Sequence, residues 1–195
     1  LETKGSLTLS SFGGTISVSK IRAAGLPGPS PVAQLDVDLE EIDLMALTAP
    51  LRFGRVSGVL RGRVHGLRVG PGFPYATAFD ADLETVKRRG VPRKIDATAV
   101  ATLSKIGGSN QLAAVLSMGL YRFFDEYYYR KMGIRAVLED GWLELHGIPK
   151  GKEEYLIIRA LRVPTLSMPI TVMTQNQKIR FNRWLTDVIR VGERR

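Results

Sequence analysis

The sequence predicts a β-rich α+β fold: an antiparallel, strongly coiled β-sheet, shaped as a groove or half-barrel, with two or three amphipathic helices packed on it. Three observations lead to this class. Apolar and polar residues alternate through most of residues 1–90 and again through 127–175, as in strands that bury one face. Residues 91–126 and 177–191 instead carry apolar residues at helical spacing. Strands grouped before and after helices argue against alternating βαβ units.

The chain has 195 residues, which suits a single domain over 1–195. Because it begins with Leu1 rather than Met, we expect it to be an excised C-terminal fragment of a longer chain. It has no apolar run of about 18 residues, the length that a membrane-spanning helix needs.

The first strands are indicated by apolar residues two positions apart. Leu7 and Leu9 are followed by Ile16 and Val18, and Gly13-Gly14 between them is a turn signal. The next strand has one apolar and one acidic face. Its apolar face is formed by Leu35, Val37 and Leu39, and its acidic face by Asp36, Asp38 and Glu40. Each segment therefore predicts a half-buried strand.

The run RVSGVLRGRVHGL alternates in the same way but carries glycine at every second apolar position. Leu60 and Val64 lie on its apolar face, and its other face carries Arg55, Arg61, Arg63 and His65. Because glycine weakens the packing of a strand, this pattern predicts sharp coiling or the close approach of another group. Residues 76–85 resume the alternation, with Phe79 and Leu83 on the apolar side.

Helical segments are indicated at three places before the second group of strands. Asp43 to Leu47 predicts one helical turn that ends before Pro50. Asp96 is a candidate N-cap for a short helix running to about residue 105. Between Leu112 and Phe124 the apolar residues recur every three or four positions, which predicts a second helix.

The last third returns to strands and ends in a helix. Strands are predicted at Tyr127–Glu139, Trp142–Gly147, Tyr155–Ala160 and Leu166–Thr174. Asp140-Gly141 between the first two is a hairpin turn signal. The terminal helix is predicted from Gln177 to Val191, with one apolar side formed by Phe181, Trp184, Leu185 and Val188.

The sequence offers little chemistry for an enzyme. It has no cysteine, which excludes disulfides and thiol nucleophiles, and its two histidines, His65 and His146, lie in strand-like segments. The pairs Asp36/Asp38 and Asp80/Asp82 lie on the polar faces of strands. Phosphate-binding loops and nucleophile elbows are absent. We therefore predict no catalytic residue, no metal and no cofactor.

Charge points to anionic partners. Lys and Arg number 28 against 19 Asp and Glu, which gives a net charge of +9. Two basic clusters contribute to it: Arg55, Arg61 and Arg63 on one strand face, and Lys87, Arg88, Arg89, Arg93 and Lys94 around Gly90. Phosphates of lipid or nucleic acid would suit them, and so would plain solvation.

Several strings resemble the C-terminal region of AsmA-like proteins of the YdbH type, which are related to TamB. They are GRVSGVLRGRVHGLRV, FDADLETVKRRGVPRKIDATAVATLSKIGG, LYRFFDEYYYRKMGIRAVLEDGWLELHGI and YLIIRALRVPTLSMPITVMTQNQKIRFNRWLTDVIRV. Their order and spacing, over about residues 52–191, carry the resemblance. One departure is Arg159-Ala160-Leu161-Arg162 before Pro164, where the family often has glycines.

The resemblance implies a periplasmic protein of Gram-negative bacteria whose parent chain is anchored in the inner membrane. Such proteins are implicated in carrying phospholipid to the outer membrane along an apolar β-groove, without enzymatic chemistry, and can meet a small outer-membrane lipoprotein. Candidate groove residues are Leu35, Val37, Leu39, Leu60, Val64, Phe79 and Leu83. Candidate headgroup contacts are Arg55, Arg61 and Arg63.

Two alternatives remain open. The chain could instead be a structural module that caps the groove and recruits an outer-membrane partner through a free strand edge near Leu166–Thr174. A nucleic-acid-binding domain is favoured by charge alone. We do not expect nucleic acid as a partner, because the basic residues lie on strand faces and in a turn, without a groove-reading helix.

Overall fold

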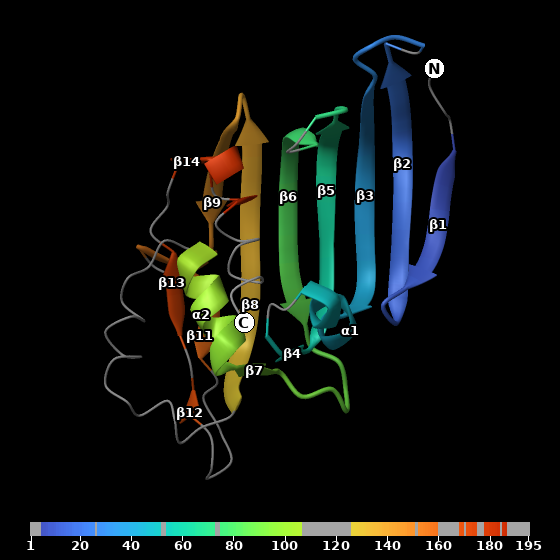
Figure 1. The fold of residues 1–195 in the computed structure, drawn as a ribbon. Coiled ribbons are helices and arrows are strands. Elements are labelled where there is room, and N and C mark those ends of the chain that lie inside the picture. Colours follow the sequence, from blue (N-terminus) through green and yellow to red (C-terminus); the bar gives the residue numbers. More distant parts are fainter. Residues whose placement is uncertain are drawn as a thin grey trace.

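The computed structural model describes residues 5–25, 27–51, 54–72, 75–106, 126–150, 152–159, 168–169, 171–174, 178–183 and 185–186. Strands formed by these residues join one sheet (Figure 1). Its first strands are β1 (Ser6–Ser11), β2 (Gly14–Ala24), β3 (Val32–Asp43), β4 (Val56–Ser57), β5 (Val59–Val69), β6 (Ala76–Val86) and β7 (Lys94–Asp96). The later strands are β8 (Glu126–Glu139), β9 (Trp142–His146), β10 (Ile148–Lys150), β11 (Glu153–Arg159), β12 (Met168–Pro169), β13 (Val172–Thr174) and β14 (Lys178–Arg180). The helices are α1 (Leu44–Thr48), the 3₁₀ helix η1 (Ala49–Leu51) and α2 (Ala97–Ile106).

The predicted β-rich class with antiparallel pairing is confirmed. Strands β1, β2, β3, β5, β6 and β8 lie side by side in that order, each antiparallel to its neighbours. Strand β8 then changes partners along its length. Its end at Arg135–Glu139 pairs with β9, and its middle, from Tyr129 to Met132, pairs with β11. Only β12 pairs in parallel among the described strands.

Two tight turns fix the register of two hairpins. Asp140 and Gly141 both have positive φ, 49° and 75°, as a two-residue type I′ turn requires, so the predicted hairpin turn is confirmed. The first hairpin turns at Phe12 and Gly13, with φ of 50° and 71°. The predicted Gly13-Gly14 turn is therefore displaced by one residue, and Gly14 instead begins β2, opposite Ser11.

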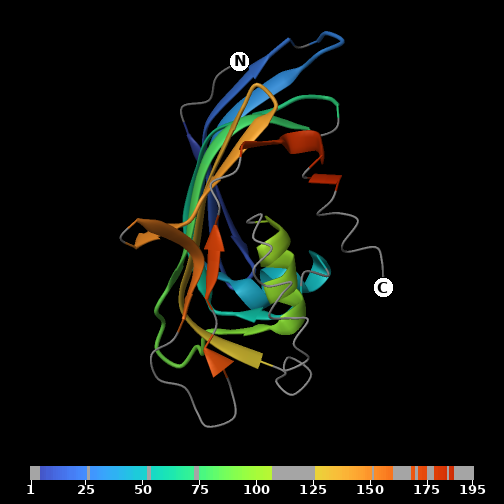
Figure 2. The same cartoon turned by 90° about the vertical axis from the view of Figure 1, so that its left-hand side faces the viewer.

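Bulges bend the sheet into a bow (Figure 2). Register shifts fall after Ser19 in β2, after Leu39 in β3 and after His65 in β5. Lys20 and Glu41, with φ of 52° and 55°, lie at two of them. Because an extra residue on one strand increases twist and bends the pair, these shifts supply the coiling that the glycine pattern predicts.

Helices α1 and α2 lie on the concave side of the bow, towards its lower end in Figure 2. They cover a buried core formed by residues of strands and helices together, including Ile42, Leu44, Val100, Tyr127 and Ile157. A second core, at the other end, joins Leu138, Leu143 and Leu145 to Phe181. There the rings of Phe79 and Phe181 meet edge to face, with centroids 6.1 Å apart.

The helix starts follow the sequence closely. Asp43 caps α1, because its side chain accepts a hydrogen bond from the N–H of Met45 at 2.8 Å. Asp96 accepts one from the N–H of Ala99, as predicted for an N-cap. Pro50 lies inside η1, so the chain continues as a tighter helix where an end was expected. None of the helices in the described ranges is long and apolar enough to cross a membrane.

Several predictions on the last part of the chain are corrected or lie outside the described residues. Lys178–Arg180, predicted as helix, forms β14 and pairs with β9, and helical geometry begins at Phe181. The predicted helix at residues 112–124 lies outside the described residues, as do residues 177, 184 and 187–191 of the predicted terminal helix and the first part of the strand predicted at Leu166–Thr174.

Gly58 illustrates the predicted close approach. It has a φ of +148°, and a Cβ built on it would clash with the hydroxyl of Tyr129. That hydroxyl is held in place because it donates a hydrogen bond to the carbonyl of Ser57 at 2.7 Å, and Tyr129 is 2% exposed. A side chain at residue 58 therefore has no room in this part of the core.

We expect Gly58→Ala to lower the free energy of unfolding by about 2–4 kcal/mol, through overpacking and backbone strain. Tyr129→Phe alone should cost about 1–2 kcal/mol for the lost hydrogen bond. The double variant should lose less than the sum, because the phenyl ring lacks the clashing oxygen. Urea denaturation measures all three. Gly72→Ala, where nothing lies within 4 Å of the new Cβ, is the control. Additive losses would contradict the clash.

Candidate functional site

One face of the sheet is apolar across seven strands. The pairing aligns a single cross-strand row formed by Leu7, Val18, Val37, Val64, Ala81, Ala136 and Leu145. The neighbouring row is formed by Leu9, Ile16, Leu39, Gly62, Leu83 and Ile134. Paired residues of neighbouring strands share a face, so the alternation seen in each segment adds up to one continuous apolar surface.

Parts of this surface are covered and parts are not. Leu39, Leu83 and Ile134 pack against the core under the helices, and Phe79 packs against the core around Phe181. Val18, Val37 and Val64 are half-buried and continue the row of Ala136 and Leu145, beyond the second core. Leu7 and Leu9, on the outermost strand, are 55% and 50% exposed. We call the accessible part the open apolar patch: Leu7, Leu9, Val18, Leu35, Val37, Val64 and Leu67.

The candidate groove residues divide between the covered and the open parts. Leu35, Val37 and Val64 lie in the open apolar patch. Leu60 lies opposite Ile42 in the core beneath α1 and is 7% exposed, so it does not line an accessible surface. The sequence did not identify Leu7, Leu9 and Val18 as site residues. Their alternation was visible, but the sequence did not show that β1 and β2 pair with β3.

The opposite face carries a ladder of ion pairs between strands. Arg63 of β5 pairs with Asp38 of β3, and Arg135 of β8 pairs with Asp80 of β6 at 2.9 Å. Glu84 lies between Lys131 and Arg61, at 2.5 and 2.9 Å, and these hydrogen bonds lower its pKa. Each basic residue named here therefore has a carboxylate partner on a neighbouring strand.

The candidate headgroup residues lie away from the open apolar patch. Arg61 and Arg63 belong to the ladder on the opposite face. Arg55 lies at the lower end, before β4, where its Nε is 3.6 Å from Asp96 and its N–H donates to the same carboxylate. The structure does not bring these three residues together at the edge of the apolar surface.

Asp36 is the most buried carboxylate of the polar face, at 9% exposed. It accepts hydrogen bonds from Lys20 Nζ and from the N–H of Gly66, both at 2.8 Å, and His65 Nδ1 lies 3.4 Å away. Lys20 first, then Gly66 and His65, lower the pKa of Asp36 to about 2, against the opposing effect of burial. Lys20 and Gly66 both have positive φ, so one carboxylate joins the bulges of β2 and β5 across β3.

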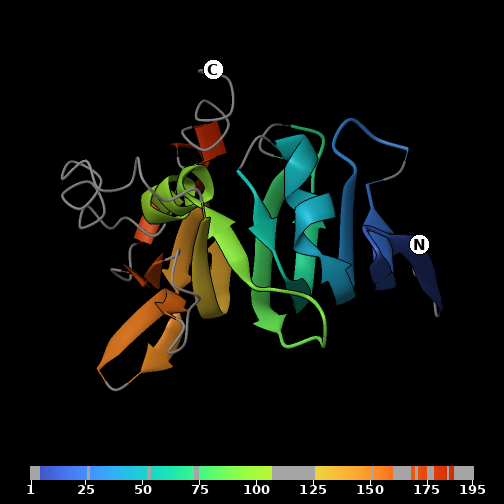
Figure 3. The ribbon, with the colours of Figure 1, turned by 90° about the horizontal axis from the view of Figure 1, so that it is seen from below.

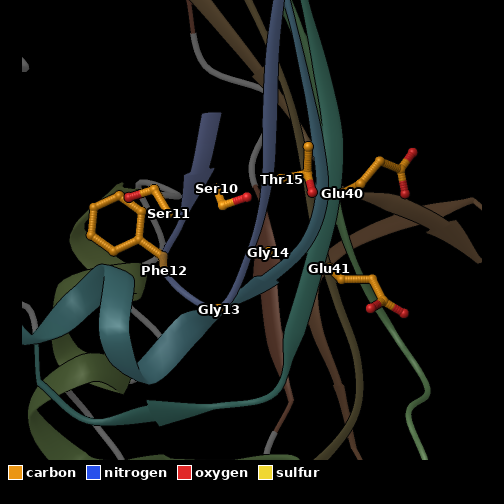
Figure 4. Close-up of a pocket in the computed structure, with 8 residues that line it drawn as sticks. All are labelled: Ser10, Ser11, Phe12, Gly13, Gly14, Thr15, Glu40 and Glu41. Atoms are coloured by element: carbon orange, nitrogen blue, oxygen red, sulfur yellow. The ribbon is translucent and has the colours of Figure 1, made fainter. Parts of the chain in front are cut away.

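Two recesses also lie on the surface of the described residues. One, of about 540 Å³, lies at the β1–β2 turn, where Ser11 and Phe12 project to one side of the strands and Glu40 and Glu41 to the other (Figure 4). The other, of about 370 Å³, lies on the polar face beneath the β10–β11 hairpin, among the paired charges of Glu84 and Arg135. In the described ranges no three His, Asp or Glu side chains are grouped to hold a metal ion. His146 and Glu154, whose Nδ1 and Oε2 atoms lie 3.6 Å apart, also line the second recess.

Asp36→Asn removes the negative charge that faces Lys20 and His65, and should therefore lower the free energy of unfolding at neutral pH. The loss should be only about 1–2 kcal/mol, because both partners are partly screened by solvent. Because the folded pKa lies below the unfolded one, the stabilisation is complete above about pH 4 and is lost as the pH falls towards 2. The difference between the two proteins should therefore shrink over that range in urea titrations. Asp140→Asn, in a turn that Asn fits equally well, is the control. A pH-independent difference would contradict the assignment.

No protein-family model, no curated protein and no solved structure matches this chain.

Proposed function

We propose that this chain is a non-enzymatic module of an AsmA-like phospholipid transport protein, and that phospholipid acyl chains bind along its apolar sheet face. The observation that carries the proposal is the continuous apolar surface over seven strands, on which the elements that the structure describes leave the open apolar patch uncovered. An open, exposed apolar surface on a domain with an otherwise charged exterior favours a ligand or partner.

Binding an acyl chain requires only apolar contact. Each methylene group that leaves water contributes about 0.8 kcal/mol, and this attraction has no preferred direction. A row of Val and Leu side chains therefore holds an acyl chain without fixing its position along the row, which suits movement. Gly62, opposite Leu39 and Leu83, lies in the covered part of the surface and leaves room for the side chain of Leu83, with which a Cβ at residue 62 would clash.

The headgroup is proposed to stay in solvent at the edge of the sheet. Arg61 and Arg63 have carboxylate partners on the opposite face, so the proposal does not use them. The resemblance of the sequence supports the rest: a periplasmic location, a parent chain anchored in the inner membrane, delivery to the outer membrane, and a small lipoprotein as a partner.

Lipid binding can be tested with Val37→Thr/Val64→Thr, which keeps β-branched residues in both strands but adds hydroxyls to the open apolar patch. We expect the unaltered chain, purified gently from bacterial envelopes, to carry phospholipid in native mass spectrometry. The variant should carry several-fold less, because the acyl chain would meet polar groups. Ser17→Thr/Ser19→Thr, on the polar face of β2, is the matched control. Absence of phospholipid from the unaltered chain would contradict the proposal.

A second candidate function, recruitment of a partner by strand addition, is favoured by β1. This strand has six uncharged residues, and within the described part of the chain it pairs only with β2. Natural edge strands usually carry charges, prolines or bulges that discourage pairing, and β1 has none of these. The edge predicted near Leu166–Thr174 is shorter, because β13 has three residues and pairs with β11.

Strand addition predicts contact at β1. A photo-cross-linking residue at Thr8 should yield an adduct with a small envelope protein, and Leu7→Lys/Leu9→Lys should abolish it, because charge at an edge opposes pairing. A cross-linker at the exposed Lys152, in the turn between β10 and β11, is the control. The same adduct from both positions, or none from Thr8, would exclude this function.

A further inference from the structure

The loop between β6 and β7 is basic and exposed. Its seven residues, Lys87–Arg93, include four cations and no carboxylate. Lys87, Arg88, Arg89 and Gly90 are all exposed. We call this segment the basic loop. The function proposed above uses none of its residues.

The basic loop is ordered by its own backbone. The N–H of Val91 donates to the carbonyl of Arg88 at 3.3 Å, and Gly90 has a φ of 83°. This is a turn with glycine at the position that needs positive φ, followed by Pro92, which restricts the backbone further. The cations are therefore presented by a defined turn.

A fifth cation joins the basic loop from the neighbouring strand. The carbonyl of Arg93 accepts the N–H of Tyr129 at 3.2 Å, and the guanidinium of Arg93 donates to the carbonyl of Arg130. These contacts place the exposed Arg130 of β8 beside the loop. The loop itself projects at the lower end of the sheet, outside the strands (Figures 1 and 3).

The charge of the basic loop is poorly compensated, in contrast to the ion-pair ladder. Arg88 lies 3.6 Å from Glu41, but both side chains are about half exposed or more, and such pairs contribute little. Lys87, Arg89 and Arg130 have no carboxylate within ion-pair distance in the part of the chain that the structure describes. Uncompensated positive charge therefore concentrates at this end of the molecule.

We propose that the basic loop and Arg130 dock this end of the chain onto a bilayer surface that contains anionic phospholipids. A projecting turn with several cations complements a plane of phosphates, and the uncharged Gly90-Val91-Pro92 between the cations allows close approach. Nucleic acid fits less well. The adjacent ring of Tyr128 is covered by Lys94, whose Nζ lies 5.2 Å from the ring centroid, so it does not offer a stacking platform for bases.

The test is sedimentation with vesicles of phosphatidylcholine, with or without about 30 mol% phosphatidylglycerol, at low and high salt. We expect binding only to the anionic vesicles, and loss of binding at high salt. Each Lys or Arg near an anionic surface contributes about fivefold to the partition coefficient, so Lys87→Gln/Arg88→Gln/Arg89→Gln should weaken binding about a hundredfold.

The matched control is Lys150→Gln/Lys152→Gln/Arg183→Gln, which removes the same charge from exposed positions elsewhere and should bind like the unaltered chain. Arg88→Lys/Arg89→Lys keeps the charge and should also bind, which separates charge from folding. The proposal is overturned if the Gln variant of the basic loop binds normally, or if both Gln variants weaken equally. Tighter binding to duplex DNA than to vesicles at the same salt also overturns it.

The outcome is separable from that of the apolar face. Val37→Thr/Val64→Thr should leave vesicle binding unchanged, and the Gln variant of the basic loop should leave the phospholipid found by native mass spectrometry unchanged. Docking and acyl-chain binding can therefore fail independently.

Discussion

An antiparallel sheet with one apolar and one charged face must have its apolar face covered, and this requirement organises the rest of the molecule. At the lower end α1 and α2 provide the cover, and at the upper end Phe181 does so against Phe79. The open apolar patch, on β1, β2, β3 and β5, is left half-buried or exposed by the described elements. The proposed lipid site is thus the part of a core that the described elements leave uncovered.

The charged face, in contrast, faces solvent. Its carboxylates and cations alternate between neighbouring strands, so opposite charges meet across the sheet and like charges are kept apart. Asp36 accepts a hydrogen bond from Lys20 and a second one from the backbone N–H of Gly66, at the bulge of β5. The polar face of the sheet therefore faces solvent and also helps to stabilise the bulges that curve the sheet.

The sequence allowed the long strands to be predicted because period-two alternation is a local property. It also located the Asp140-Gly141 turn, the cap at Asp96 and the helical turn that begins after Asp43. The strands β7, β10 and β14 were missed, since three residues on their own are too few to show a period. The break between β4 and β5 was also not foreseen, because both lie in the single alternating run RVSGVLRGRVHGL. At the candidate site, the shared face of Val37 and Val64 followed from alternation. The cover over Leu60 and the carboxylate partners of Arg61 and Arg63 did not, because both depend on which distant strands become neighbours.

Strand β8 pairs with β6, β7, β9, β11 and β12, and so connects most of the sheet's second half to its first. The hairpins that precede it form from contacts close in sequence, which favours early and rapid formation. The core containing Tyr127 and Ile157 needs β8 and the strands after it. During synthesis from the N-terminus, α1 and α2 are made before β8, but the core that they cover also needs Tyr127 and Ile157. The apolar faces of β1 to β6 therefore stay incompletely covered until β8 and its partners have left the ribosome.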